Sequence, residues 1–376
     1  MGFGLRKTVA ALALVLLFAA FIGGCGSADS TKDAAEQNGD KAVITDMLGR
    51  KVEVSVPAER LVAIGPGALR LVCYAGGAEK VVGIENFEKQ HSVGRPYILA
   101  HPELKNLPTI GQGGPDSAPD MEKLVAVKPD VIFAAYLLDK SRADELQAKT
   151  GIPVIVLSYG EKVPFDEDVY ESLKLIGRVT GKEERAEMVV EYLEKCRKDL
   201  MKRTGDIPKD ERPRVYVGAL GMKGSHGIES TAAEYGPFDA VGAVNVADET
   251  GSSGSIMIEK EKLLSWDPDI IFIDEGGLPL VREDYRKNKK FYQSLKAFKN
   301  ERVYGQIPFI FYTANIDTAV ADAFFVGKVV FPEQFKDVDP VKKADEIYGF
   351  MLGKPLYEQM AEDFGGFKKI TLKNLE

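Results

Sequence analysis

A segment of twelve residues occurs twice in this chain, as Glu122–Phe133 (EKLVAVKPDVIF) and Glu261–Phe272 (EKLLSWDPDIIF). In both copies, apolar residues at helical spacing lead to a Pro-Asp pair, and β-branched and aromatic residues follow. Proline disfavours helix for the residue before it, so each helix must end there. The apolar run is typical of a strand buried on both faces, as in parallel sheets. A unit that occurs only twice predicts two related α/β lobes rather than a solenoid.

Length and composition agree with two lobes. The chain has 376 residues, which is long for a single core, and its 45% hydrophobic and 28% charged residues are globular values. Its net charge is −8 and it has no basic block, so the sequence predicts no nucleic-acid partner. Cys73 and Cys196 follow no spacing pattern and are interpreted as free structural thiols.

The N-terminus has the pattern of an export signal. Arg6 and Lys7 precede an apolar run over 9–22, which is too short for a spanning helix. The run ends in Gly23-Gly24-Cys25, and this junction resembles a bacterial lipobox. We therefore expect residues 1–24 to be a lipoprotein signal peptide and 25–42 a flexible tether with Cys25 lipidated. The alternative is an ordinary signal in which Cys25 is incidental. Either form predicts an extracytoplasmic protein, and acylation predicts one anchored to the cell membrane.

The remaining chain divides into three parts. Residues 43–160 form a predicted N-terminal lobe that opens with a hairpin around Leu48-Gly49. Residues 161–209 are a predicted linker, because 165–204 reads as nearly unbroken helix. Residues 210–376 form a predicted C-terminal lobe, in which 231–241 reads as a helix and 248–255 as a loop. The predicted fold class is α/β, with two Rossmann-like lobes built on central parallel sheets and joined by one long helix.

Four features together resemble one known family. They are the lipobox, the opening Thr45-Asp46-x-x-Gly49-Arg50 hairpin, the repeated segment with its Pro-Asp pair, and the single helical linker. The chain resembles the substrate-binding proteins of ABC importers in the iron-chelate and cobalamin class, which are class III periplasmic binding proteins. The resemblance covers nearly all of 41–335. It implies a monomer that captures a small solute between its lobes and delivers it to a membrane permease.

The resemblance also assigns a role to the glutamate that opens each repeat copy. In the family this residue lies at the tip of its lobe and pairs with arginines of the permease. By position these residues are Glu122 and Glu261. A carboxylate in the first turn is also favoured by the helix dipole alone, and the two interpretations are compatible.

Candidate ligand-binding residues follow predicted strands, because ligands of parallel α/β sheets bind beyond the carboxyl ends of the strands. They are Gly65, Pro66, Gly67, Arg95, Tyr97, Tyr136, His226, Ser255 and Tyr312. An arginine among Gly, Pro and Tyr can bind a carboxylate, hydroxamate or catecholate oxygen with its forked donors. Phe309, in contrast, is expected to pack in the core.

All three histidines, His91, His101 and His226, lie in predicted loops. His91 and His226 are candidates to meet across the cleft and contact a metal. The alternative is that they are ordinary loop histidines. No histidine pair has metal-ligand spacing, so a directly bound divalent metal is the least favoured ligand.

Three solute classes remain open on this sequence. A ferric chelate of the siderophore type fits the scattered Arg, Tyr and His residues and is the first choice. A molybdate or tungstate oxyanion would use backbone N–H groups in the glycine-rich loops. A corrinoid would need a broad aromatic platform, yet the only tryptophan, Trp266, lies in a predicted helix. No nucleotide-binding or hydrolase motif is present, so the sequence predicts no enzyme and no cofactor other than a bound iron(III) chelate as ligand.

Overall fold

The computed structural model describes residues 40–114, 117–136 and 139–376. The predicted signal peptide, Cys25 and almost all of the tether lie outside the described residues. The N-terminal lobe contains β1 (Asp40–Thr45), β2 (Lys51–Val56), β3 (Leu61–Ile64), α1 (Ala68–Tyr74), β4 (Val81–Gly83), α2 (Asn86–Gln90), α3 (Pro96–Ala100), α4 (Met121–Ala126), β5 (Val131–Ala134), α5 (Lys140–Thr150) and β6 (Val154–Val156).

The C-terminal lobe follows two helices, α6 (Glu167–Thr180) and α7 (Glu183–Thr204). It contains β7 (Arg214–Gly218), β8 (Ser230–Ala233), α8 (Gly236–Asp239), β9 (Val244–Asn245), β10 (Gly254–Met257), α9 (Lys260–Trp266), β11 (Ile270–Asp274), α10 (Leu278–Lys287), α11 (Lys289–Ser294), α12 (Lys296–Lys299), β12 (Val303–Gln306), α13 (Ile316–Val330), α14 (Pro340–Leu352), α15 (Tyr357–Phe364), β13 (Lys368–Lys369) and α16 (Leu372–Leu375).

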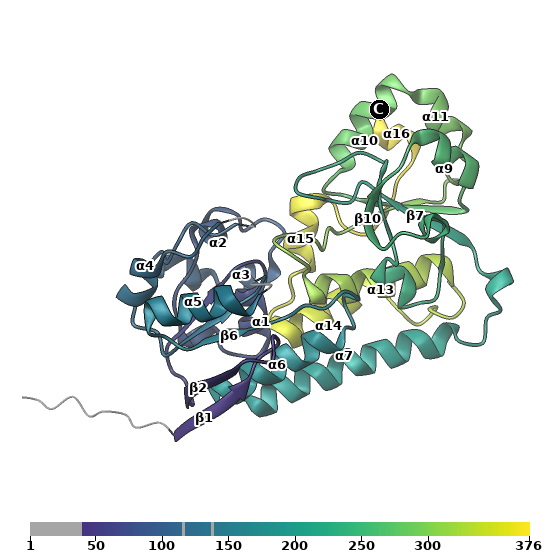
Figure 1. Ribbon diagram of the computed structural model, residues 1–376. Coiled ribbons are helices and arrows are strands. Elements are labelled where there is room, and N and C mark those ends of the chain that lie inside the picture. Colours follow the sequence, from purple (N-terminus) through teal and green to yellow (C-terminus); the bar gives the residue numbers. More distant parts are fainter. Residues whose placement is uncertain (1–39, 115–116, 137–138) are drawn as a thin grey trace, which may run out of the picture. The chain divides into compact units, whose positions relative to one another are not determined.

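Each lobe is built on its own largely parallel sheet, which confirms the predicted fold class (Figure 1). The N-terminal sheet has the order β4-β3-β5-β6, and all its strand pairs are parallel. The C-terminal sheet has the order β13-β12-β11-β7-β9, and only its edge strand β13 is antiparallel. The central strands β5 and β11 are fully buried, as their apolar sequences predict.

The predicted hairpin is present: strands β1 and β2 pair in antiparallel orientation. Gly49, in the turn, has a φ of 71°, a left-handed conformation that favours glycine. Asp46 fixes this turn, since its carboxylate accepts from the backbone N–H groups of Leu48 and Arg50. The Arg50 side chain pairs with the same carboxylate at 3.1 Å.

The predicted single helix over 165–204 is wrong, because the segment folds as two helices that pack on each other (Figure 1). Gly181 ends α6 in a left-handed conformation, with a φ of 67°. Helix α6 packs on α1 and β2, whereas α7, of 22 residues, packs on α13 of the C-terminal lobe. The link between the lobes is therefore α7, and α6 is part of the N-terminal lobe.

The two copies of the repeated segment have the same structure. In each copy a residue with positive φ follows the short helix: Lys128, with a φ of 47°, after α4, and Asp267, with a φ of 40°, after α9. An arginine before the neighbouring strand donates to backbone carbonyls at the end of that helix. Arg60 donates to Val127 and Lys128, and Arg214 donates to Trp266.

The Pro-Asp pair joins each copy to its sheet. Asp130 accepts from the backbone N–H of Arg60 at 2.9 Å, and Asp269 accepts from that of Arg214 at 2.8 Å. The backbone N–H of each aspartate donates in return to the same arginine's carbonyl. These matching contacts show that the two copies occupy equivalent places in the two lobes.

Replacement of Asp130 or Asp269 by alanine is expected to lower the free energy of unfolding by about 1 to 2 kcal/mol in each case, because backbone donors lose their acceptor. Urea denaturation measures the change. Glu145→Ala is the control, since its partner Lys149 is exposed and such pairs contribute less than about 0.5 kcal/mol. Equal effects of all three variants would contradict the structural role of the aspartates.

Two predictions for the C-terminal lobe are wrong. The segment 231–241 is not one helix but strand β8 followed by the short helix α8, whose first turn contains Pro237. Residues 248–255 are not all loop, because Gly254 and Ser255 begin β10, which pairs with β8. This pairing joins segments about twenty residues apart, and local sequence patterns do not reveal such contacts.

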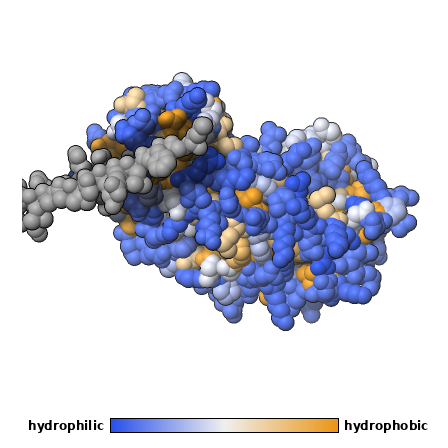
Figure 2. Space-filling view, turned by 90° about the horizontal axis from the view of Figure 1, so that it is seen from below, coloured by the Kyte–Doolittle hydropathy of each residue, from blue (hydrophilic) through white to orange (hydrophobic). Residues whose placement is uncertain are grey.

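The surface seen from the side of α7 is largely hydrophilic, with scattered hydrophobic residues (Figure 2). Within the three described ranges, no helix has the length and apolarity needed to cross a membrane.

Candidate functional site

A cavity of about 640 Å³ lies where residues of both lobes meet at the carboxyl ends of the strands. We call it the interlobe cavity. From the N-terminal lobe it is lined by Pro66, Phe87, Gln90, His91, Val93, Arg95 and Tyr136. From the C-terminal lobe it is lined by Gly221, Lys223, Gly224, Ser225, Asp274, Gly276, Pro308, Ile310, Phe311, Tyr312 and Thr313.

Arg95 is built into the wall of the cavity. It is 1% exposed and donates to Glu88 at 2.7 Å and to the carbonyl of Phe87 at 3.0 Å. Its guanidinium lies 4.7 Å from the centre of the Phe87 ring and 5.1 Å from that of Tyr312. Glu88 also accepts from the hydroxyl of Tyr97, which is fully buried. The charge of Arg95 is thus balanced by Glu88, and Tyr97 supports this pair from behind.

Tyr312 connects the two lobes at the cavity. Its hydroxyl donates to Glu85 at 2.9 Å and accepts from the backbone N–H of Gly114 at 2.8 Å. Glu85 also accepts from the backbone N–H of Gly65 at 3.1 Å. Burial raises the pKa of Glu85 to about 7, so this carboxyl is partly protonated near neutral pH.

Asp274 is the last residue of β11 and is 2% exposed. One of its oxygens accepts from the backbone N–H of Gly276 at 2.9 Å. Burial raises its pKa to about 8, and the nearby acid Glu275 adds to the rise. At neutral pH this side chain is therefore mainly a neutral carboxylic acid, which can donate a hydrogen bond to a solute.

Lys223 supplies the uncompensated positive charge of the cavity. It is exposed, lies in the glycine-rich loop after β7, and forms no ion pair within the part of the chain that the structure describes. With Arg95 paired to Glu88 and Asp274 mainly neutral, Lys223 leaves the lining of the interlobe cavity with a net positive charge.

The predicted ligand residues fall into three groups. Pro66, Arg95, Tyr136 and Tyr312 line the interlobe cavity, and so does the candidate metal residue His91. Three others lie directly behind it: Gly65 binds Glu85, Gly67 precedes α1 and contacts Tyr159, and Tyr97 supports Arg95.

Two predicted residues lie outside the lining. His226 is next to the lining residue Ser225, but its ring nitrogen lies 2.8 Å from the carbonyl of Met222. Ser255 lies in β10 opposite Ala232 and is exposed.

The candidate metal residue His91 packs on the ring of Phe87, with ring centroids 4.7 Å apart. Among the described residues, no three His, Cys, Asp or Glu side chains converge well enough to hold a metal ion.

Two acids were not among the predicted ligand residues. Asp274 lines the interlobe cavity, and Glu85 lies beside it, bound to the lining residue Tyr312. Both lie where the rule of strand ends points, because Asp274 is the last residue of β11 and Glu85 lies two residues after β4. Phe309, two residues from the lining residue Phe311, is buried in the core as expected.

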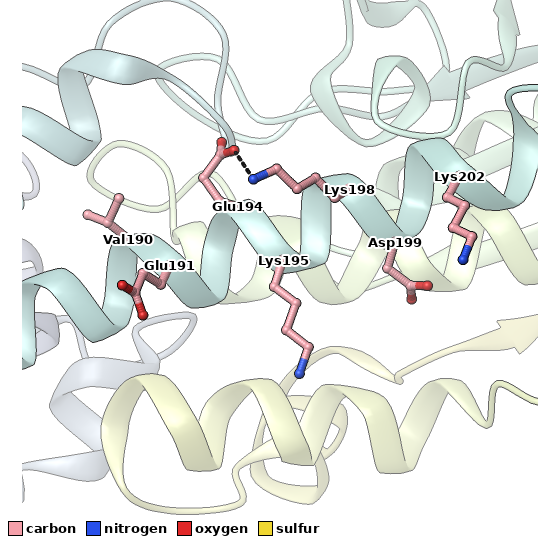
Figure 3. A pocket seen from close by; sticks show the side chains of 7 residues that line it. All are labelled: Val190, Glu191, Glu194, Lys195, Lys198, Asp199 and Lys202. Atoms are coloured by element: carbon pink, nitrogen blue, oxygen red, sulfur yellow. Dashed lines mark ion pairs between the residues drawn. The ribbon is translucent and has the colours of Figure 1, made fainter.

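A second hollow, of about 570 Å³, lies along α7 (Figure 3). All seven residues that line it belong to this one helix, and all but Val190 are charged. Glu194 and Lys198 form an ion pair at 3.5 Å across its edge. Side chains from a single helix cannot enclose a solute on two sides. This hollow is therefore the solvated face of the linker helix α7.

Glu122 and Glu261 occupy the same position in the two lobes. Both are exposed, and both lie in the first turn of their helices, α4 and α9. Neither forms an ion pair with a described residue; the adjacent Lys123 pairs instead with Asp120 at 2.9 Å. Both carboxylates are therefore available to a partner.

Comparison with known proteins agrees with this architecture. A model of the periplasmic binding protein family matches residues 61–306. The chain belongs to the periplasmic binding protein family.

Three curated relatives are similar to most of this chain. The molybdate-binding protein MolA of Haemophilus influenzae is 27% identical, over 81% of this chain and 89% of MolA. The iron-uptake system-binding protein of Bacillus subtilis is 24% identical, over 79% of this chain and 90% of the relative. The ABC transporter substrate-binding lipoprotein YvrC of Bacillus subtilis is 22% identical, over 89% of this chain and all of YvrC. The solved structure of MolA bound to molybdate has the same fold, with a TM-score of 0.64 at 23% identity, and covers 84% of this chain and 98% of MolA.

Proposed function

We propose that this protein is the extracytoplasmic solute-binding component of an ABC importer, and that it captures an anionic ferric chelate of the siderophore type in the interlobe cavity. The observation that carries the proposal is the cavity itself. Its volume of about 640 Å³ falls in the range of about 300 to 1,000 Å³ typical of sites for drug-sized ligands. A tetrahedral oxyanion would leave most of this space empty.

The chemistry of the walls supports a chelate. Phe87, Tyr136 and Phe311 offer aromatic surface to planar groups, and Lys223 offers positive charge to their oxygens. The iron-uptake relative supports iron as the cargo. Trp266, the last residue of α9, is 3% exposed and packs in the core of the C-terminal lobe, so no tryptophan platform for a corrinoid lines the cavity.

A molybdate or tungstate oxyanion is the second candidate, because MolA is similar over most of both chains. Such an ion would use backbone N–H groups of the loop Gly221–Ser225 and the charge of Lys223, and would fill one end of the cavity.

Delivery to the membrane completes the proposed function. The lipoprotein relative supports lipidation at Cys25 and an anchored, extracytoplasmic location. We assign Glu122 and Glu261 to docking on the permease, one from each lobe, and expect a monomer to dock. In this role the protein binds and releases its solute without chemical change, so it has no catalytic residues.

Calorimetry on the mature chain tests the solute class. Native mass spectrometry and metal analysis of the purified protein come first, and titrations with a ferric tris-catecholate, a ferric tris-hydroxamate and molybdate follow. Binding of a ferric chelate but not molybdate is the expected result. Molybdate binding alone would favour the second candidate, and binding of none of them would contradict both.

The charge of Lys223 gives a sharper test. Lys223→Glu is expected to weaken binding of the anionic solute at least about tenfold, which is about 1.4 kcal/mol, because attraction becomes repulsion. Lys202→Glu on α7 is the matched control: it makes the same charge change at another exposed lysine, beside the hollow of Figure 3. Weaker binding in the control alone would place the site on α7.

A further inference from the structure

Arg70 is a fully buried arginine without a carboxylate partner among the described residues. It lies in α1, directly after the first strand of the N-terminal sheet. Moving a guanidinium out of water is strongly unfavourable unless its N–H groups find acceptors. The position of those acceptors therefore indicates what the residue does.

Three of the four acceptors are backbone carbonyls of the other lobe. Arg70 donates to Phe311 at 2.7 Å, to Ala314 at 2.9 Å and to Tyr312 at 3.3 Å. The fourth is the hydroxyl of Tyr159, at 3.2 Å. Because guanidinium donors diverge in one plane, a single arginine can bind several carbonyls of one tight turn.

The turn has a backbone conformation that requires support. Tyr312 has a φ of 54° and Thr313 a φ of 65°, both in the left-handed region. Two non-glycine residues in succession in this region strain the backbone. Hydrogen bonds from a charged donor to carbonyls on both sides of the strained pair offset this cost.

The turn is also part of the wall of the interlobe cavity: Phe311, Tyr312 and Thr313 all line it, whereas Arg70 does not. The segment lies between β12 and α13 of the C-terminal lobe, yet most of its side-chain anchors come from the N-terminal lobe. Besides Arg70, Tyr136 contacts the hydroxyl of Thr313 at 2.8 Å.

We infer that Arg70 is a positioning residue for the solute site: from behind the cavity it fixes the aromatic turn Phe311–Ala314 to the N-terminal lobe. The importance of this turn for binding rests on the proposed function. The anchoring itself does not, and it can be measured without a solute.

Amide hydrogen exchange tests the anchoring. Arg70→Lys keeps the charge and loses the forked donors. The amides of Phe311 and Asn315 are expected to exchange at least about tenfold faster in this variant, since Phe311 donates to Thr313 within the turn and Asn315 donates to Phe309 across its base. Arg185→Lys is the matched control. Arg185, in the linker helix α7, also donates to backbone carbonyls of the C-terminal lobe, at Phe350 and Met351, and these are far from the turn in sequence. Unchanged exchange at the turn in the Arg70 variant would overturn the inference.

A second variant keeps the inference testable if Arg70→Lys fails to fold. Tyr136→Phe removes an anchor of the same turn at an exposed side chain. Exchange at Phe311 is expected to stay within about twofold of the wild type, because Arg70 holds the turn. Release of the turn by this change would show that Arg70 is not the main anchor.

Titration with the ferric tris-catecholate and with molybdate separates the inference from the proposed function. Arg70→Lys is expected to weaken whichever probe the wild type binds by about tenfold or more, while Arg185→Lys leaves it unchanged. If the wild type binds neither probe, the proposed function fails and the exchange result still decides the inference. If a probe binds equally to wild type and Arg70→Lys, the positioning role is wrong.

Discussion

Charge reversal at both Glu122 and Glu261 is expected to abolish solute uptake and leave the affinity for the solute intact. Both carboxylates are exposed, occupy equivalent places on the two lobes and have no ion pair with a described residue. Replacement by lysine converts two attractive contacts with a basic partner into repulsive ones, and like charges at an interface cost several kcal/mol. Transport of radiolabelled solute by cells and calorimetry on the purified protein measure the two effects.

The control for this experiment is Glu184→Lys with Glu187→Lys, which makes the same charge change at two exposed residues of α7. Normal uptake is expected. Each single variant at 122 or 261 should transport at an intermediate rate. A double variant with changed affinity and normal uptake would rule out docking at these residues.

The second large effect concerns Asp274, the buried acid that lines the interlobe cavity. Asp274→Asn is expected to raise the free energy of unfolding at pH 8 by about 2 to 5 kcal/mol. The pKa of Asp274 rises from an ordinary 3.8 to about 8 in the folded protein, so the folded state holds a proton that the unfolded state has lost. Wild-type stability from this group is complete below about pH 4 and falls as pH rises towards 8. In Asp274→Asn this loss of stability with rising pH is absent, because asparagine does not ionise.

The charges around Asp274 do not change the sign of this effect. Glu275 raises its pKa, and the buried Asp322 has a raised pKa of its own that Asp274 increases. Lys368 pairs with Glu275 at 2.7 Å, and Lys223 lines the same cavity as Asp274. Asp274, Glu275 and Asp322 are thus three neighbouring buried acids, and of these only Glu275 forms an ion pair with a lysine, Lys368, among the described residues. Ionisation of any one of them makes ionisation of the others less favourable.

Urea denaturation at pH 5 and pH 8 measures this effect. Asp337→Asn is a control of opposite sign, because Arg203 lowers the pKa of Asp337 to about 2 and its stabilisation is present at pH 8. In wild type, affinity for the anionic solute should also fall as pH rises through about 8, and this fall should be absent in Asp274→Asn. A variant no more stable than wild type at pH 8 would show that Asp274 is ionised.

Much of the fold could be predicted because it depends on local patterns. The repeat, the Asp46–Arg50 turn and the buried strands β5 and β11 each carry their signal within a dozen residues. The linker could not be predicted in the same way. Glycine at 181 is compatible with a helix interruption or with a chain reversal, and the packing of α6 on β2 decides between them.

The candidate site was predictable only in outline. The rule that ligands bind at strand ends led to Pro66, Tyr136 and Tyr312, which line the cavity. It also led to Ser255, which the antiparallel pairing of β10 with β8 places elsewhere. The burial of Arg70 arises from contacts between residues more than two hundred positions apart, and no local pattern predicts such contacts.

The solute site itself can be located by hydrogen exchange of the mature protein with and without its solute. If the solute is held between two related lobes, amides of Phe87–Arg95 and of Gly221–Ser225 should both be protected on binding, and those of α7 should not change. Protection confined to one lobe, or to α7, would contradict capture in the interlobe cavity.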